Sequence, residues 1–529
     1  MTLLDLAIIA GYLGCTLLLS AWLARTITSP DDYYVAGRAM PWWALALSTT
    51  ATQSSANSFI GIPAFVALVP GGGLTWLQYE LAVPLGILVV MVVLVPVFRG
   101  LGLVSIYEYL EIRFDRPTRL LLSGVFLISR AAATGVALYA AAVVVQVCTG
   151  LPLTASVLTM GGVTVVYDML GGMRAVVWTD VLQMVVLLGG IAVCAAFGWT
   201  AAGGWAGLIN DVGPARLHAI DWAHGVGDGA RAPFWGFLVG GFVLYVAYYG
   251  VDQTQVQRQL SARNVRHAQR LLAANALARF PLTLMYAGLG LLMAAVYARS
   301  EELRLAVPAA RLDFLVPRFI ELVLPPGARG FVVAAILAAA MSSLDSALNS
   351  LSAATMRDFV GSRGTPRRQL TISRLVTLAW ATVITIVGIQ AGSFASNVIE
   401  GINRVGALFY GPLLAAFMCG MLDRRATGPS VRAGVAAGLG VNLLLLMLFG
   451  RSLFWMWWNV SGLVVATCTC ALLARAFPSP RTVPTTRGLL GATSIARQLV
   501  DVRRWALAMV VYTSGVIGFL AWLGDISPS

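Results

Sequence analysis

The sequence predicts an all-α polytopic membrane protein with about fourteen transmembrane helices, and three observations support this. Hydrophobic residues make up 58% of the 529 residues and charged residues only 11%, which excludes an ordinary soluble globular protein. Apolar runs of about 20 residues, enough for a helix to cross a bilayer, recur to the end of the chain. Arginines gather between alternate runs, as is typical of cytoplasmic loops.

The hydrophobic segments and the arginines between them predict the topology. The segments are 4–24, 42–66, 75–98, 120–146, 152–170, 177–199, 234–257, 270–297, 329–357, 370–393, 395–421, 430–450, 454–475 and 504–523. Loops and helix ends on one side hold 25 arginines and those on the other side hold 8, while Arg130, Arg279 and Arg404 lie within segments. This bias predicts that the arginine-rich loops are cytoplasmic and that both termini lie outside.

Composition also limits the cellular location and the partners. Segment 4–24 lacks a basic leader and an A-x-A cleavage site, so we expect a retained helix. We therefore expect a multi-pass protein of the plasma (inner) membrane, surrounded by the lipid bilayer. The net charge of +13 comes from arginines, most of them in short loops, which indicates membrane orientation and no nucleic-acid partner. The six cysteines show no metal-ligand spacing, and we expect inert thiols.

The segment 329–359 begins as an apolar membrane helix and then acquires a polar face. At 100° per residue, the polar side chains fall within roughly 160° of the helix circumference. They are Ser342, Ser343, Asp345, Ser346, Asn349 and Ser350. A carboxylate at this depth is costly unless it lines a cavity or holds an ion, so this face predicts a cation site. The alternative is helix–helix contact through serines and small residues, which would not require Asp345.

Two segments are predicted to be broken near the middle of the membrane. Residues 47–61 place a dense run of Ser, Thr, Asn and Gln inside a span, where side chains compete for backbone hydrogen bonds. Unwound backbone at this depth is tolerated only where it lines a cavity. The alternative is a continuous helix whose hydroxyls bond back to the preceding turn. Gly250 and Asp252 indicate a second break, in segment 234–257.

The two broken helices are the second and the seventh segments, five positions apart in the order, which indicates an inverted repeat. We expect repeats over approximately 42–199 and 234–421, within a transmembrane domain of residues 1–475. Residues 476–503 are predicted to be a cytoplasmic linker, and 504–529 to hold a final transmembrane helix and a short outer tail.

Charged residues inside the spans are the remaining candidates for function. Arg130 lies about 16 Å deep in its segment, where an arginine must be paired or face water. It could pair with a carboxylate on a neighbouring helix, Glu80 included, or bind a substrate anion. Asp180 lies only about two turns inside the sixth segment, at a depth similar to the lower end of the 342–349 polar face.

The chain resembles the sodium/solute symporter family, which includes sodium–glucose, proline and sialic acid transporters. The resemblance covers about residues 4–475. It rests on DYYVAGRAMPWW (32–43), SIYEYLEIRF (105–114), GGMRAVVWTDVLQ (171–183), GVDQTQVQR (250–258), AAAMSSLDSALNS (338–350) and VIEGINRVGALFYGPLLAAF (398–417). The resemblance implies a 5+5 inverted-repeat fold and solute uptake driven by the sodium gradient, with Na⁺ as the coupling ion.

The resemblance also implies two sets of sodium ligands. The shared sodium site would use the carbonyls of Ala51, Ser54 and Ala339 and the hydroxyls of Ser342 and Ser343. Oxygen ligands of this kind suit a hard cation. A second sodium would be held by Asp180, Ser342, Asp345 and Ser346. Sialic acid transporters carry a serine where Asp345 stands, so Asp345 could strengthen this site or act as a proton-coupling carboxyl.

Substrate contacts are implied in the first broken helix and in the third, fourth and seventh segments. By position they are Gln53, Ser55, Ser58, Gln78, Glu80, Arg130 and Tyr248. Arg130 resembles an arginine that binds the carboxylate in sialic acid transporters, whereas Glu80 resembles a sugar-binding glutamate of sodium–galactose transporters. We therefore expect a small polar solute: an acidic sugar such as sialic acid, another organic anion, or a sugar.

Two other classes of function remain as alternatives. An uncoupled sodium channel or a transport-like sensor would look similar in sequence. A polytopic membrane enzyme would need a catalytic histidine or paired carboxylates at an interface. The three histidines, at 218, 224 and 267, lie in loops without a partner motif, so we do not expect an enzyme.

Overall fold

The computed structural model describes residues 1–227, 233–309, 311–361, 364–391, 398–450, 452–477 and 489–526. The chain is built from helices, with no strand among these residues. Ten stretches are long and apolar enough to cross a membrane. They are α1 (Leu3–Ala24), the stretch Gly73–Leu101, α8 (Arg116–Thr149), α9 (Leu153–Ala201), α13 (Val265–Arg299), Ala328–Val360, α17 (Pro366–Gln390), α19 (Gly428–Phe449), α20 (Trp457–Ala476) and, within α21 (Ala492–Ile526), Thr493–Gly524.

Shorter helices complete the bundle and its periphery. The stretch Gly73–Leu101 consists of η2 (Gly73–Glu80), α5 (Val83–Val89), η3 (Val90–Leu94) and α6 (Val95–Leu101). The stretch Ala328–Val360 consists of α16 (Ala328–Ala354) and η7 (Thr355–Val360). The remaining helices of the bundle are α3 (Trp42–Gln53), α4 (Ala56–Leu68), η5 (Gly236–Gly240), α11 (Gly241–Val251), the polar α12 (Gln253–Ser261) and α18 (Val398–Leu422). Short connecting helices are α2 (Pro30–Val35), α7 (Glu108–Arg113), α10 (Gly204–Asp211), α14 (Glu301–Ala306) and α15 (Leu315–Val323).

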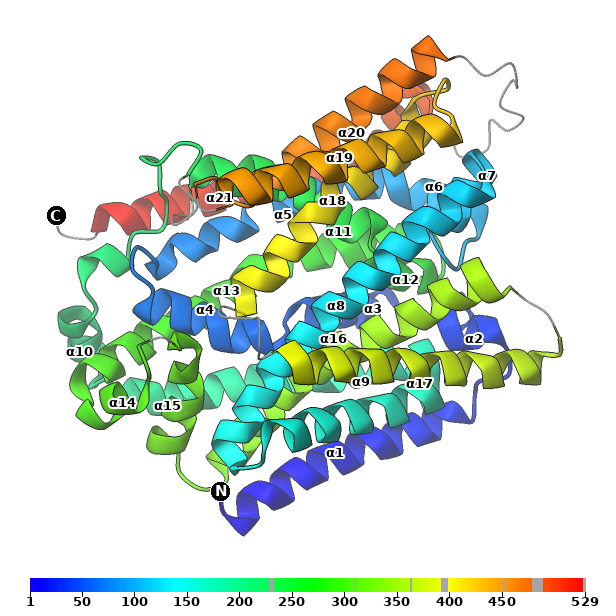
Figure 1. Ribbon diagram of the computed structural model, residues 1–529. Coiled ribbons are helices and arrows are strands. Elements are labelled where there is room, and N and C mark those ends of the chain that lie inside the picture. The colour runs from blue at the N-terminus through cyan, green and yellow to red at the C-terminus, as the bar shows by residue number, and fades with distance from the viewer. Residues whose placement is uncertain are drawn as a thin grey trace.

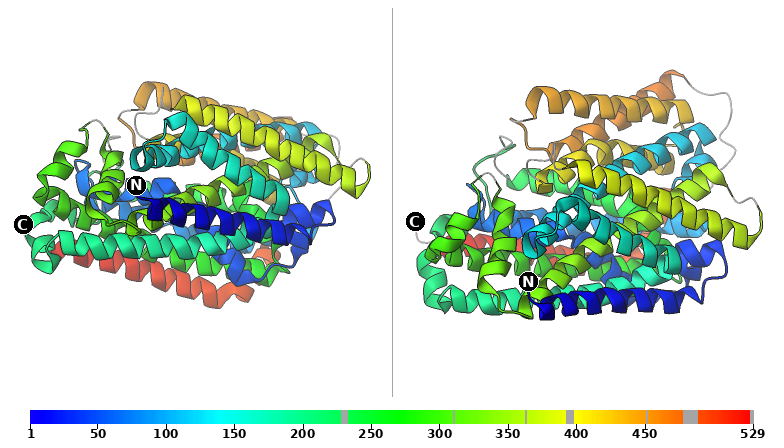
Figure 2. Two further views of the ribbon diagram at one scale, coloured as in Figure 1. Left: turned by 90° about the horizontal axis from the view of Figure 1, so that it is seen from below. Right: turned by 60° about the horizontal axis from the view of Figure 1, so that its bottom comes forward.

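The helix with the polar face, α16, lies at the centre. In Figure 1, α3, α11, α12 and α16 occupy the middle, while α1 lies along one side and α19 to α21 along the other. The left view of Figure 2 shows α21 in red along an outer edge. Of the most apolar window of α16, 89% is buried inside the protein, against 22% for α1 and for α21. Because α16 packs on α9, α8, α1 and α3, its polar face meets other helices rather than lipid.

Both predicted breaks are present. Between α3 and α4 the chain leaves the helical conformation at Ser54 (φ −86°, ψ 65°) and Ser55 (φ −73°, ψ 170°). Between α11 and α12 it does so at Asp252 (φ −90°, ψ 114°). The structure thus has the two discontinuous helices that the sequence predicts. The count of fourteen helices and the 5+5 repeat stay predictions.

A single glycine divides the longest helix. A straight helix of 49 residues would be about 74 Å long, more than twice the hydrocarbon thickness of a bilayer. Gly172 interrupts α9 with φ 49° and ψ −155°, between the predicted segments 152–170 and 177–199. A Cβ on Gly172 would lie 2.6 Å from the Tyr33 carbonyl oxygen. The break therefore needs glycine both for its conformation and for its packing.

The C-terminal region differs from the prediction. The last helix, α21, begins at Ala492, twelve residues before the predicted start at 504. Residues 492–503 are rich in residues that favour helix, although they are too polar to be read as part of an apolar span. Of the predicted linker 476–503, residues 478–488 lie outside the described part of the chain.

We predict that Gly172→Ala destabilises the protein, whereas Gly162→Ala on the same helix does not. Alanine at 172 must adopt a conformation that costs about 1–3 kcal/mol and must also displace Tyr33. A Cβ at Gly162 meets no atom within 4 Å, and alanine there favours helix by up to about 1 kcal/mol. Thermal unfolding of the purified variants in detergent measures both effects. Equal melting temperatures would show that the break at 172 does not require glycine.

Candidate functional site

The first break is prepared by hydroxyl groups in the last turns of α3. Thr49, Thr50 and Thr52 each donate to the carbonyl four residues earlier, at 2.7–2.9 Å. The predicted alternative, back-bonded hydroxyls, therefore holds for these three threonines, yet the helix still ends at Gln53. Such back-bonding weakens a helix, which is consistent with the unwinding that follows at Ser54.

Two serines of α16 face the backbone of this break. Ser342 Oγ lies 3.1 Å from the Ala51 carbonyl oxygen and 3.0 Å from that of Ala339. Ser343 Oγ lies 2.9 Å from the Thr52 carbonyl oxygen and 3.4 Å from that of Ala339. We call these two hydroxyls and three carbonyls the oxygen ring. The ring contains four of the five residues predicted for the shared sodium site.

The chemistry of the oxygen ring fits sodium. Every member is a neutral oxygen atom, the ligand type that hard cations prefer. The fifth predicted residue, Ser54, is the non-helical residue that follows the ring in the break. Thr52 was not predicted as a ligand. Its carbonyl could have been considered, because it lies in the last turn before the break, next to Ala51.

The residues predicted for a second sodium surround an arginine. Asp180 Oδ2 accepts hydrogen bonds from Ser48 Oγ at 2.5 Å and from Arg258 Nη2 at 2.9 Å. Arg258 Nη2 also contacts Ser346 Oγ, and that hydroxyl lies 3.1 Å from Asp345 Oδ1. The side chains of Arg258 and Asp180 are 1% and 0% exposed. Two of the four predicted ligands, Asp180 and Ser346, thus contact one guanidinium. The other two contact Ser346, which lies 3.1 Å from Asp345 and donates to the Ser342 carbonyl at 2.6 Å.

A third carboxyl group lies in the same region and was missed from the sequence. Asp168 on α9 is fully buried, and within the described residues neither of its side-chain oxygens has a hydrogen-bond partner. The buried amide of Asn349 lies beside this carboxylate and interacts favourably with it. Asp168 could have been found by the criterion applied to Arg130, because it is a charge inside an apolar segment. We call Asp168, Asp180, Asp345 and Arg258 the buried charge cluster.

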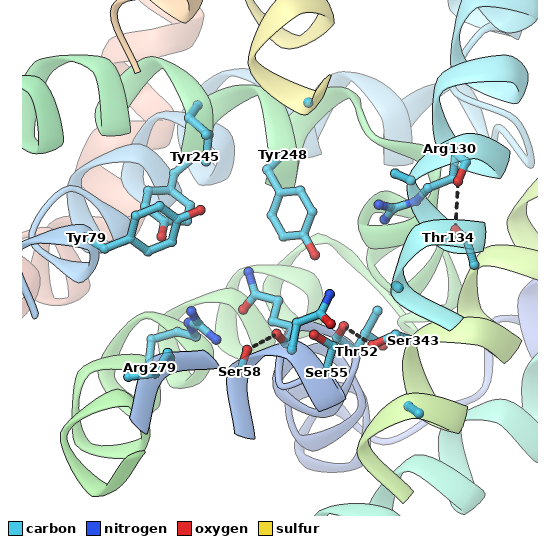
Figure 3. A pocket seen from close by; sticks show the side chains of 18 of the residues that line it. Thr52, Ser55, Ser58, Tyr79, Arg130, Thr134, Tyr245, Tyr248, Arg279 and Ser343 are labelled. Atoms are coloured by element: carbon cyan, nitrogen blue, oxygen red, sulfur yellow. Dashed lines mark hydrogen bonds between the residues drawn. The ribbon is translucent and has the colours of Figure 1, made fainter. Parts of the chain in front are cut away.

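A cavity of about 210 Å³ lies beside the oxygen ring. Figure 3 shows Arg130 and Tyr248 reaching into it from α8 and α11, opposite Ser55 and Ser58 of the first break. Six of the seven predicted substrate contacts line it, namely Gln53, Ser55, Ser58, Glu80, Arg130 and Tyr248. Thr52 and Ser343 line it as well, so the cavity and the oxygen ring share a wall.

The seventh predicted contact, Gln78, does not line this cavity. Its side chain is fully buried, donates to the Thr75 carbonyl at 3.0 Å and accepts from the Asp221 backbone amide at 3.1 Å. Gln78 therefore connects η2 to the loop that contains Asp221.

Glu80 is paired with Arg279 of α13, so it is not the carboxylate that pairs with Arg130. Arg279 Nη2 lies 2.5 Å from Oε1 and Nε lies 3.1 Å from Oε2, a two-point contact of guanidinium and carboxylate. Thr283 Oγ1 donates to Oε1 at 2.9 Å. Both carboxylate oxygens thus have partners, which leaves Glu80 poorly suited to bind sugar hydroxyls.

Arg130 is paired with a carboxylate and also lines the cavity, while its predicted contact with a substrate anion stays a prediction. Its Nη2 lies 3.3 Å from Asp252 Oδ2, and its Nε donates to Thr254 Oγ1 at 2.8 Å. The carboxylate is on a neighbouring helix, as the structural alternative required, but it belongs to the second break. Arg130 also lines the cavity, with 16% of its side chain exposed against 3% for Asp252. It is therefore a paired arginine that still faces the cavity.

We predict that Glu80→Ala acts mainly on stability. The variant leaves Arg279 buried without a counter-ion, which costs about 3–5 kcal/mol and lowers the melting temperature in detergent. Glu321→Ala is the control, because its partner Arg318 is 33% exposed and such pairs contribute at most about 1 kcal/mol. A stable Glu80→Ala protein with altered sugar selectivity would instead assign Glu80 to substrate binding.

Comparison with known proteins agrees with this architecture. The family model described as sodium:solute symporter family matches residues 33–438. The human sodium/iodide cotransporter is 32% identical over 422 residues, which are 78% of this chain and 64% of that protein. The bovine sodium-coupled monocarboxylate transporter 2 is 30% identical over 421 residues, 78% of this chain and 67% of that protein. The chain therefore spans about two thirds of the length of these relatives.

A solved structure supports the same fold. A Na⁺-coupled sialic acid symporter in a substrate-bound outward-open state superposes with a TM-score of 0.80, covering 90% of this chain and 99% of that one at 24% identity. Since the family model covers most of the chain and the fold agrees, the protein belongs to the sodium:solute symporter family.

Proposed function

We propose that this protein is a sodium-coupled symporter that imports a small organic or inorganic anion by alternating access. The observation that carries the proposal is the wall shared by the cavity and the oxygen ring. Thr52 and Ser343 belong to both, so sodium in the ring would fix the wall that the substrate contacts. Such a shared wall supports coupling, because binding at one site changes the free energy of binding at the other.

Two features favour an anion over a neutral sugar, and a third favours a compact anion. Arg130 presents a guanidinium to the cavity, whereas the carboxylate of Glu80 is occupied by Arg279. The named substrates of two relatives, iodide and monocarboxylate, are anions. The cavity of about 210 Å³ is smaller than the 300–1,000 Å³ typical of drug-sized ligands, which favours a compact anion over an acidic sugar such as sialic acid.

A second sodium bound by Asp180, Ser342, Asp345 and Ser346 belongs to this proposal. Carboxylates in a protein interior need a cation or a proton to offset their charge. The buried charge cluster has three carboxyl groups and one guanidinium, that of Arg258. The resulting excess of carboxyl groups supports a further cation site next to Arg258. In the same proposal both termini lie outside the plasma (inner) membrane, and the moving units are the repeats 42–199 and 234–421.

An uncoupled sodium channel is the alternative to coupled transport. Sodium uptake into proteoliposomes separates the two. A symporter accumulates sodium faster when the anion is present, whereas a channel passes sodium at the same rate with and without it. The same assay tests the proposal as a whole.

We predict that Ser343→Ala lowers the apparent sodium affinity roughly tenfold. The change removes one hydroxyl from the oxygen ring, and a lost polar contact is typically worth about 1 kcal/mol or more. Ser373→Ala is the matched control, since Ser373 is buried in α17 and bonds back to the Gln369 carbonyl. Sodium-dependent thermal stabilisation of the purified proteins measures the effect. An unchanged sodium dependence in the Ser343 variant would remove this residue from the site.

We predict that Arg130→Lys weakens anion binding by roughly tenfold or more while the protein stays folded. Lysine keeps the charge beside Asp252 but loses the planar fork that contacts a carboxylate at two points. Iodide, lactate, sialic acid and galactose form the test panel for uptake, and Arg432→Lys, in the ion pair with Asp115, is the control. If galactose is the preferred ligand of the wild type, the anion proposal fails.

A further inference from the structure

The half-helix α12 carries an opposite charge at each of its ends. Asp252 precedes its first residue, and Arg258 lies in its last turn. All nine residues of α12 are buried. Asp252 contacts Arg130, which lines the substrate cavity. Arg258 contacts Asp180, one of the residues proposed to bind the second sodium. One rigid element thus connects the two places where the proposed ligands bind.

At the cavity end, the two carboxylate oxygens of Asp252 make separate contacts. Its Oδ2 contacts Arg130 Nη2 at 3.3 Å and accepts a hydrogen bond from Tyr410 at 3.1 Å. Its Oδ1 accepts from the Thr254 backbone amide at 2.9 Å and so caps the start of α12. A second cavity, of about 30 Å³, is lined by Arg130, Asp252 and Tyr410. Any movement of the Asp252 carboxylate therefore changes both the Arg130 contact and the end of α12.

At the other end, Arg258 contacts two of the four residues proposed to bind a second sodium, Asp180 and Ser346. Its guanidinium bonds to Asp180, to Ser48 Oγ at 2.7 Å and to Ser346 Oγ. It also donates to the Thr254 carbonyl at 2.8 Å, which fixes its side chain to its own helix. A sodium ion that bound Asp180 and Ser346 would have to take these oxygens from Arg258.

Each charge on α12 thus has the sign of the proposed ligand on its side. We propose that Asp252 and Arg258 are internal substitutes for the substrate anion and for the second sodium, and that exchange of both for the ligands releases α12 to move. This inference rests on the proposed function, which supplies the anion and the second sodium. Without ligands the two ion pairs hold α12 in place, because separating a buried pair without replacement is strongly unfavourable.

The release of α12 would reach beyond the binding sites. The side chain of Gln253, next to Asp252, accepts from the Ile106 backbone amide at 3.0 Å and donates to the Val104 carbonyl at 2.7 Å. Both contacts lie in the loop between α6 and α7, one of the arginine-rich loops predicted to be cytoplasmic. Displacement of the N-terminal end of α12 would therefore pull on the cytoplasmic side.

The test is to remove the negative charge of Asp252 while keeping a side-chain oxygen that caps the start of α12. Asp252→Asn retains an oxygen for the Thr254 amide, and Asp252→Ser is a second variant that also caps helices well. Because the internal competitor for Arg130 is removed, both variants are expected to bind iodide and lactate about tenfold more tightly than the wild type. Binding to purified protein in detergent is measured by calorimetry at fixed sodium. Both variants are also expected to leak sodium from proteoliposomes without any anion.

The sodium end is tested with sodium itself as the probe. Arg258→Gln removes the internal cation, so thermal stabilisation by sodium is expected at about tenfold lower concentration than in the wild type. Asp358→Asn is the matched control, because Asp358 forms a buried ion pair with Arg119 outside both sites. This control is expected to change neither anion affinity nor sodium affinity.

Weaker or unchanged anion binding in both Asp252 variants, without a sodium leak, would overturn the inference and make the Arg130 pair merely structural. Unchanged or weaker sodium binding in Arg258→Gln would overturn the inference at the sodium end and make the pair of Arg258 with Asp180 merely structural. These results are distinct from failure of the proposed function, which would appear in the wild type as no sodium-dependent uptake of iodide or lactate.

Discussion

The pairing of Arg130, Arg258 and Arg279 with carboxylates is the constraint on which the rest of this structure depends. In a low-dielectric interior an unpaired charge is so costly that each of these three guanidinium groups contacts an acid. Arg279 has Glu80, Arg130 has Asp252, and Arg258 has Asp180. Each pair joins helices that are distant in sequence. The pairs therefore fix how α8, α9 and α13 lie around the second break and the cavity.

The two broken helices provide polar groups at the positions proposed for the ligands, which the three ion pairs alone do not provide. At the first break, backbone carbonyls leave the helical pattern and face the hydroxyls of α16, which gives neutral oxygens for a cation. At the second break, Asp252 both caps α12 and pairs with Arg130, so a charged group lies where the backbone is free to bend. In the proposed function, the same sequence feature, polar residues that interrupt an apolar run, would build both a site for a cation and a contact for an anion.

Much of this site follows from the sequence, because polar residues inside apolar runs are rare enough to be informative. Both breaks, the serines of α16 and the exposure of Arg130 to a cavity were predictable in this way. The role of Arg258 was not. α12 carries four glutamines, so its hydropathy is that of a loop, yet it is buried by protein rather than exposed to water. Hydropathy measures the cost of contact with lipid and gives no information on a polar helix enclosed by others. The pairing of Glu80 with Arg279 also required three-dimensional distances, since several arginines lie at similar depth.

The charges around the two proposed ligands are balanced differently. Two arginines and two carboxylates surround the substrate cavity, in the pairs of Arg130 with Asp252 and of Arg279 with Glu80. An anion that enters the cavity can bind one of these guanidinium groups fully only if it displaces the carboxylate that is already paired with it. The buried charge cluster instead has three carboxyl groups for one guanidinium, so a cation that replaces Arg258 at Asp180 still meets an excess of carboxyl groups. In the proposed function, sodium is therefore favoured by this excess, whereas the substrate competes with Asp252 for Arg130. This difference makes Asp252, together with Arg130, a determinant of how tightly an anion would be held.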